Sequence, residues 1–280
     1  MAEFPPAPAP DPALSDAASD GSTPTETADV GPTPGLADQS RTGARPRPTA
    51  AERIVALLEV ILCSDYPTQL ALAATFAAFG LQPFGSDGTL SANYVFLLSI
   101  ADTIFLIGLV VIFLKAHGER PRDIFLGRRP LGAELRVGIP LTLVVFTIAA
   151  TALLAVQKLA PGLHNVERNP MQDLIRTPLN VALFAVIAVV AGGLREEVQR
   201  AFLLHRFEVS LGGPLVGVIA TSAAFGAGHV VQGFDAALAI GLIGAFWAVI
   251  YMRRRSVGAP VVSHSCFNLL QIVQFLVFAG

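Results

Sequence analysis

Long apolar stretches alternate with short polar ones over residues 66–278, and this alternation is the strongest pattern in the chain. A helix needs about 20 apolar residues to cross a hydrocarbon core of about 30 Å. Seven stretches approach that length: 66–83, 92–114, 137–157, 178–200, 214–232, 235–252 and 257–278. Helices are favoured over strands, because backbone N–H and C=O groups in lipid must be bonded within their own segment. The pattern predicts an all-α polytopic membrane protein with about seven transmembrane helices.

The residues before the first apolar stretch differ in character. Residues 51–64 place apolar and polar positions on opposite faces of a helix, which predicts a short interfacial helix. Residues 1–50 hold half of the chain's 20 prolines and many Ala, Ser, Thr and Asp residues. Such a composition buries too little apolar area to offset the entropy of ordering. We therefore predict a disordered tail at 1–50 and a transmembrane helical domain at 51–280.

Composition and charge support this interpretation. Only 14% of the residues are charged and 53% are hydrophobic, whereas about a quarter of a soluble domain is charged. With the N-terminus in the cytoplasm, most Lys and Arg residues fall in cytoplasmic loops, and the outer loops hold only Lys158, Arg168 and Arg176. The positive-inside rule thus favours a multi-pass cell-membrane protein with a cytoplasmic N-terminus and an outer C-terminus. The net charge of −2 gives no indication of nucleic-acid binding.

A small set of ionisable residues lies within or at the ends of the apolar stretches, where each is costly and therefore a functional candidate. The set comprises Asp102, Arg195, Glu196, Glu197, Arg200, His229 and His264. Three pairs stand four residues apart, and so share a helix face: Glu196 with Arg200, Phe225 with His229, and His264 with Asn268. We expect the three helices to direct these pairs into one water-filled pocket. Asp102 receives no role.

The grouped side chains suit hydrolysis. A carboxylate in such a pocket can act as a general base on water, and a neighbouring His can share the proton. A second His and an Asn can stabilise the oxyanion of a tetrahedral intermediate. Glu196, His229 and His264 could instead hold one divalent metal such as zinc, with a position left for water. Each residue also has a purely structural interpretation, as a surface ion pair or a packed histidine.

The segments EEVQR (196–200), FGAGH (225–229) and HSCFN (264–268) resemble the motifs of the CPBP family of intramembrane proteases, which includes the type 2 CAAX prenyl endopeptidase. The resemblance covers roughly residues 135–278, and it implies an intramembrane endopeptidase that cleaves a membrane-anchored protein or peptide. It implies Glu196 as the base, His229 as its assistant, and His264 with Asn268 as the oxyanion site. Both metal-dependent and metal-free glutamate mechanisms have been described for the family, so the cofactor stays open.

The chain departs from the family motif in the spacing of its arginine, and the predicted spans place two candidate residues at different depths in the membrane. The family arginine stands four residues after the second Glu, whereas Arg200 stands three after Glu197, so either Glu could face the pocket. Glu196 is near the inner end of its predicted span and His229 near the outer end of the next. They meet only if a helix departs from a straight crossing, and we predict that the fifth helix turns within the membrane. The alternative function is a non-catalytic scaffold or immunity protein, or a small-solute transporter, on the same fold.

Overall fold

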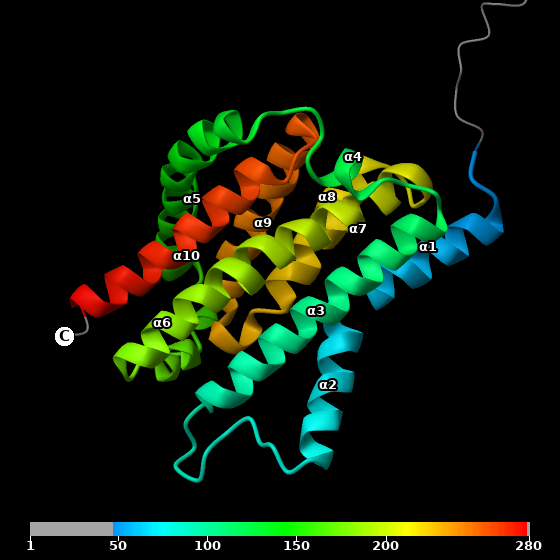
Figure 1. The fold of residues 1–280 in the computed structure, drawn as a ribbon. Coiled ribbons are helices and arrows are strands. Elements are labelled where there is room, and N and C mark those ends of the chain that lie inside the picture. The colour runs from blue at the N-terminus through cyan, green and yellow to red at the C-terminus, as the bar shows by residue number, and fades with distance from the viewer. Residues whose placement is uncertain (1–46, 279–280) are drawn as a thin grey trace, which may run out of the picture. The chain divides into compact units, whose positions relative to one another are not determined.

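The computed structural model describes residues 47–278, whose regular elements are helices (Figure 1). Five of these helices are long and apolar enough to cross a membrane. They are α3 (Ala92–Ala116), α5 (Leu131–Leu159), the continuous helix Pro178–Ser210, α9 (Phe234–Arg254) and α10 (Gly258–Phe278). The all-α polytopic fold predicted from the apolar pattern is confirmed.

The number of spans is lower than the predicted seven. Helices α1 (Ala50–Leu62) and α2 (Tyr66–Ala78) have 13 residues each and meet at a bend of 45°, so that they count together as at most a sixth span. Helix α8 (Pro214–Ala227) has 14 residues, and its length of about 21 Å falls short of a hydrocarbon core. The tail predicted at 1–50 lies, except for its last four residues, outside the described part of the chain.

The longest helix changes its winding in the middle. It begins as α6 (Pro178–Ile187), where the Thr177 side chain accepts the N–H of Asn180, continues as a π-helical segment (Ala188–Arg195), and ends as α7 (Glu196–Ser210). Short π-helical segments are rare and frequently lie at functional sites, because the wider turn redirects the residues that follow. Here those residues are the two adjacent glutamates.

Two glycines in the π-helical segment allow α10 to approach it closely. A Cβ on Gly192 would stand 2.6 Å from the Nδ2 of Asn268, and a Cβ on Gly193 would collide with the hydroxyl of Ser265. Any larger side chain would therefore separate the two helices.

The chain turns sharply after α8. A single 3-10 turn (Val230–Gln232) follows His229, and α9 begins at Phe234 after Gly233, whose φ of +117° suits a residue without a side chain. A Cβ on Gly226 would stand 2.7 Å from the carbonyl oxygen of Ala237, so α8 and α9 pack with their backbones in close contact. Helix α8 ends at Ala227, five residues before the end of the apolar stretch predicted at 214–232, and the turn within the membrane stays a prediction.

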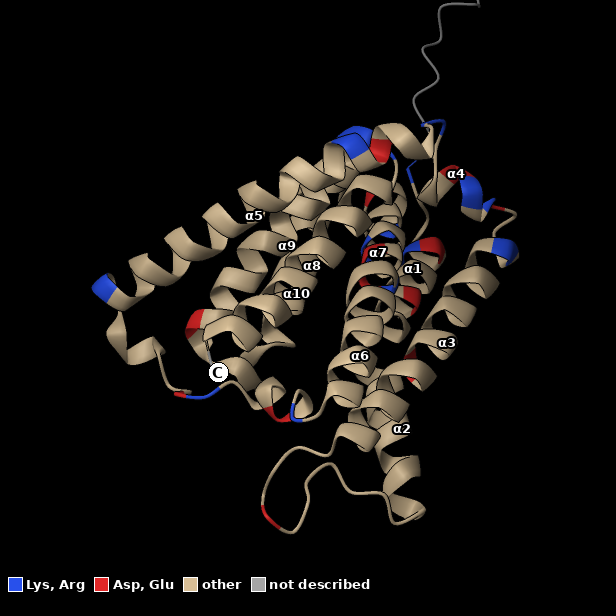
Figure 2. Cartoon of the chain, turned by 60° about the vertical axis from the view of Figure 1, so that its left-hand side comes forward, with Lys and Arg blue, Asp and Glu red and all other residues tan. Residues whose placement is uncertain are grey.

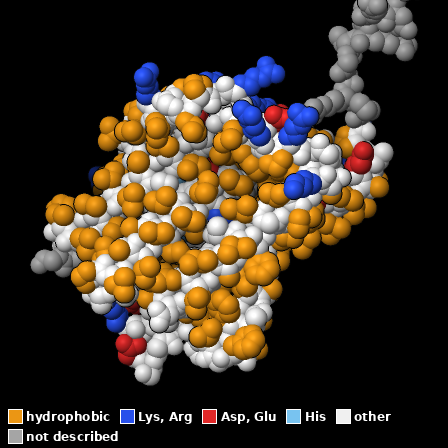
Figure 3. Space-filling view, in the orientation of Figure 1, with side chains coloured by type: hydrophobic (Ala, Val, Ile, Leu, Met, Phe, Trp, Pro, Cys, Tyr) orange, Lys and Arg blue, Asp and Glu red, His pale blue; other side chains and the backbone are white. Residues whose placement is uncertain are grey.

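The surface and the charges agree with a membrane environment. Large apolar side chains cover much of the face shown in Figure 3. Ile104, Leu143 and Leu215 are among the exposed apolar residues of the chain, at 66%, 71% and 71%. Lys and Arg residues gather around α4 (Pro121–Phe125) and the neighbouring helix ends (Figure 2). An apolar girdle with basic residues at one end is what a lipid bilayer requires of a multi-pass protein.

Candidate active site

The two adjacent glutamates begin α7 and have different surroundings. Glu197 is almost fully buried, with 1% of its side chain exposed. It accepts hydrogen bonds from the guanidinium of Arg200, three residues later, and from the Nδ1 of His264 at 2.9 Å. Both partners bond the same oxygen of this carboxylate, Oε1. Glu197 does not line the cavity and lies behind its wall.

Glu196 faces the cavity. Its Oε1 accepts a hydrogen bond from the Nη2 of Arg195 at 3.3 Å, and its buried Oε2 has no hydrogen-bond partner. The Nε2 of His264 lies 3.7 Å from that Oε2, beyond hydrogen-bonding distance. Each glutamate thus has one bonded oxygen and one buried oxygen without a partner, and of the two only Glu196 lines the cavity.

His229 lines the same cavity from the turn after α8. Its Nδ1 is 2.8 Å from the carbonyl oxygen of Phe225. Because a carbonyl only accepts hydrogen bonds, Nδ1 carries the proton and the neutral ring has its lone pair on Nε2. This histidine is therefore in the tautomer that can accept a proton from a bound molecule.

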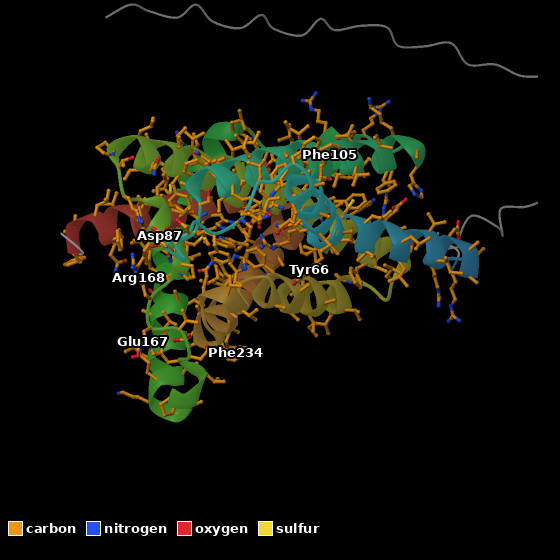
Figure 4. All side chains as sticks on the ribbon, turned by 90° about the horizontal axis from the view of Figure 1, so that it is seen from below. Tyr66, Asp87, Phe105, Glu167, Arg168 and Phe234 are labelled. Atoms are coloured by element: carbon orange, nitrogen blue, oxygen red, sulfur yellow. The ribbon has the colours of Figure 1, made fainter. Side chains whose placement is uncertain are left out.

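The cavity has a volume of about 270 Å³ and lies between the elbow joining α1 to α2, the start of α7 and the end of α8. Tyr66, labelled in Figure 4, closes the elbow against α8 by donating its hydroxyl to the carbonyl of Ala224 at 2.8 Å. The polar part of the lining consists of Ser64, Asp65, Tyr66, Gln69, Arg195, Glu196, Gln199, Arg200, Thr221, His229 and Gln232. The site is therefore a polar cavity within an apolar bundle.

His264 and Asn268 lie behind the cavity and do not line it. His264 is 5% exposed, and its ring stacks on Trp247 with centroids 3.9 Å apart. Asn268 donates its Nδ2 to the carbonyl of Ala188 at 3.1 Å, at the start of the π-helical segment. His264 is buried and Asn268 is partly buried, and both contact the supporting structure, so the oxyanion role that the resemblance implies for this pair stays a prediction.

Arg200 and Phe225 support the site together. The guanidinium carbon of Arg200 lies 4.5 Å from the centre of the Phe225 ring and 5.6 Å from that of Trp247. Aromatic faces attract a cation, and more strongly where water is excluded. The arginine that fixes Glu197 is thus itself fixed by two rings on two other helices.

Several residues of the site had no signal in the sequence. Asp65 lies just before an apolar stretch and belongs to no motif, and Trp247 and Thr221 belong to apolar stretches without a motif. Asp102 is an acidic residue in the middle of a predicted span, which marks it as a candidate, but the sequence does not show that it pairs with Arg195. Asp102 and Asp65 both bind Arg195, as described below.

The possible metal set does not assemble. Within residues 47–278, no three His, Cys, Asp or Glu side chains are placed to hold a metal ion. Glu196, His229 and His264 approach the same region, but His264 directs its Nδ1 to Glu197 and His229 directs its Nδ1 to a backbone carbonyl. The residues present do not fit a zinc centre, and no step below passes through a metal.

Comparison with known proteins bears on the three motifs. Residues 178–270, about a third of the chain, match the family model described as Type II CAAX prenyl endopeptidase Rce1-like. The matched segment contains all three motifs and the π-helical segment. No curated protein matches the chain, and no solved structure matches it.

Proposed function

We propose, on the premise that residues 178–270 place this chain in the CAAX protease family, that it is an intramembrane endopeptidase acting on a membrane-anchored protein or peptide. One observation carries the proposal. Glu196, whose Oε2 has no hydrogen-bond partner, and His229, whose Nδ1 is 2.8 Å from a backbone carbonyl, both line one polar cavity, and three separate helical segments build that cavity. A general base and a second proton acceptor beside enclosed water are the requirements of peptide hydrolysis.

In the proposed reaction, Glu196 removes a proton from a water molecule as the water oxygen attacks the carbonyl carbon of the scissile bond. A tetrahedral intermediate forms. When it collapses, the C–N bond breaks and the proton held by Glu196 passes to the leaving nitrogen, which gives a carboxylic acid and an amine. His229 accepts a hydrogen bond from the water through Nε2 and shares the proton during transfer.

We assign positioning roles to the residues behind the cavity. Glu197, held by Arg200 and His264, anchors the start of α7, and Trp247 holds the His264 ring by stacking. Asn268 ties α10 to the π-helical segment. These contacts fix the direction in which Glu196 points, and geometric precision of this kind is necessary for a general base.

Thr221 is the best-placed additional contact for a bound peptide. It lines the cavity on α8, its side chain is buried, and its hydroxyl has no hydrogen-bond partner. Residues 221, 225 and 229 stand four apart and so lie along one face of the chain at α8. A buried hydroxyl without a partner costs about 1–3 kcal/mol, which a peptide carbonyl in the cavity would offset.

The setting of the reaction follows from the charge pattern. We propose that the basic end of the bundle faces the cytoplasm, with the N-terminus on that side and the C-terminus outside. The partners are then the lipid bilayer and a substrate held in it by its own anchor.

The test is cleavage by the purified full-length protein in liposomes, with a library of fluorogenic peptides carrying a lipid or helical anchor. We expect cleavage by the wild type and none by Glu196→Gln or His229→Ala. Two matched controls lie away from the cavity and should retain cleavage: Glu134→Gln, a buried carboxylate paired with Arg254, and His117→Ala, a histidine paired with Glu59. Absence of wild-type cleavage across the library, or full activity in Glu196→Gln, would refute the proposal. Solute uptake into the same liposomes without cleavage would identify a transporter.

A further inference from the structure

A second buried charge network lies beside Glu196 and has no part in the mechanism above. Its centre is Arg195, with 6% of its side chain exposed. The Nη1 of Arg195 donates to Asp65 at 2.5 Å and to Asp102 at 2.9 Å, while Nη2 donates to Glu196 at 3.3 Å. One guanidinium therefore joins the elbow between α1 and α2, the middle of α3, and the proposed base.

The two aspartates are themselves held in place. Thr68 donates its hydroxyl to Asp102 at 2.7 Å, and Gln69 donates its amide to Asp65 at 2.8 Å. The side chain of Asp102 is 3% exposed in the middle of an apolar span. Removing such charges from water is costly, and a buried ion network is weak evidence for a stabilising role. The contact between this network and Glu196 points instead to a functional role.

We propose that Arg195 is the positioning residue of Glu196, and that Asp65 and Asp102 set how much of its positive charge acts on that carboxylate. The proposal rests on the function proposed above. Arg195 donates to Oε1 of Glu196 and leaves the buried Oε2 without a partner, so its contact makes the two oxygens of the proposed base different. The carboxylates on its other arm compete with Glu196 for the same guanidinium.

Glu196 is also faced by other charged or titratable groups: Glu197 and Arg200 from α7, His264 from α10, and His229 from the end of α8. Substitutions at Arg195 and Asp102 leave all of these in place. The two substitutions change the hold of Arg195 on Glu196 in opposite directions, whereas a loss of packing alone would not give opposite effects. Arg195→Gln removes a positive charge at 3.3 Å, whereas Asp102→Asn weakens a competing acceptor of the same guanidinium.

The experiment is the pH dependence of kcat/KM for the cleaved peptide. A charge within about 4–6 Å shifts the titration of a carboxylate by about 1–3 pH units. We expect the acidic limb to move to higher pH by about 1 unit or more in Arg195→Gln, and to lower pH in Asp102→Asn. Arg195→Lys keeps the charge but loses the second arm, so kcat should fall while the limb stays in place.

Glu134→Gln is the matched control, because Glu134 is also buried and bound by an arginine, Arg254, at 2.6 Å. It should lower thermal stability and leave the acidic limb unchanged. An unchanged limb in both Arg195→Gln and Asp102→Asn, or a shift of both in the same direction, would overturn the proposal.

A second readout does not depend on cleavage. Infrared difference titration, with the Glu196 carboxylate band assigned through Glu196→Gln, should show the same opposite shifts in the two variants. If the wild type cleaves nothing, the proposed function fails, and the infrared titration still decides whether Arg195 controls Glu196. If the wild type cleaves and Glu196→Gln does not, but neither the limb nor the band responds to Arg195→Gln, only the positioning role fails.

Discussion

Thr221→Val removes one buried hydroxyl and changes almost nothing else. Thr221 and its neighbour Ser222 are each 7% exposed, and neither hydroxyl has a hydrogen-bond partner. Thr221 lines the polar cavity, whereas Ser222 lines a shallow apolar depression between α8 and α9. The pair therefore separates the effect of losing a buried hydroxyl from the effect of losing a contact with the substrate.

The magnitude follows from what each hydroxyl touches. A hydrogen bond from Thr221 to a peptide carbonyl contributes about 0.5–1.5 kcal/mol, which corresponds to a fall in kcat/KM of about 2- to 13-fold in Thr221→Val. In the free protein the same hydroxyl is an unpaired buried group. Its removal should therefore not lower the free energy of unfolding. If the full cost of the unpaired hydroxyl is relieved, the free energy of unfolding rises by about 1–3 kcal/mol. Ser222→Ala should have the same effect on stability and none on kcat/KM.

Both quantities are measurable on the same preparation. Cleavage of an anchored peptide in liposomes gives kcat/KM. In a Cys266→Ala background, which removes the partly exposed second thiol, a thiol-reactive fluorophore follows thermal unfolding in detergent, because Cys63 is fully buried and reacts only when the bundle opens. Thr221→Ser, which keeps the hydroxyl, should retain most of the activity. Equal kcat/KM in Thr221→Val and wild type would refute the proposed contact. An equal loss in Ser222→Ala would show that the effect comes from the helix and not from the cavity.

Three further outcomes are expected. Gly193→Ala should destabilise the protein by about 1–3 kcal/mol through overpacking against Ser265, and an unchanged melting temperature would contradict the close packing described above. Cleavage should survive exhaustive chelation, whereas loss with recovery on adding zinc would refute the metal-free mechanism. Burial raises the pKa of Glu119, but hydrogen bonds from His205 and Arg206 outweigh it and hold that pKa at about 2, below the usual 4.5. This lowered pKa contributes stability that is full above pH 4.5 and lost as the pH falls toward 2. Glu119→Gln should therefore melt below the wild type at pH 7, and the gap should narrow below pH 4.5; a constant gap would contradict the assignment.

The sequence by itself determined the class of fold and indicated the candidate residues of the site. Seven apolar stretches approach the length at which a membrane-spanning helix satisfies both side chains and backbone groups, and the structure has helices long enough to span at five of them. Charged and polar residues within such stretches are costly unless they converge. Glu196, His229 and His264 are therefore candidates from the sequence alone, and their motifs resemble those of the CAAX protease family.

Only the tertiary structure decided which glutamate faces the cavity. The spacing of Arg200 allowed either one, because residues three and four apart are both neighbours on a helix. The π-helical segment before Glu196 and the contact of α10 with Gly193 set the rotation of α7. That rotation depends on a second helix about 70 residues away and has no local signature.

The same reason explains the other differences. The length of α8 depends on how its end packs against α9, and an apolar stretch that continues to Gln232 conceals the turn after Ala227. Asp65, Asp102 and Arg195 form one network from three segments separated by long stretches of chain. The periodicity of apolar residues in the sequence shows which side chains lie on which face of each helix. Which faces meet is determined by packing between helices, and that information is in the assembled bundle alone.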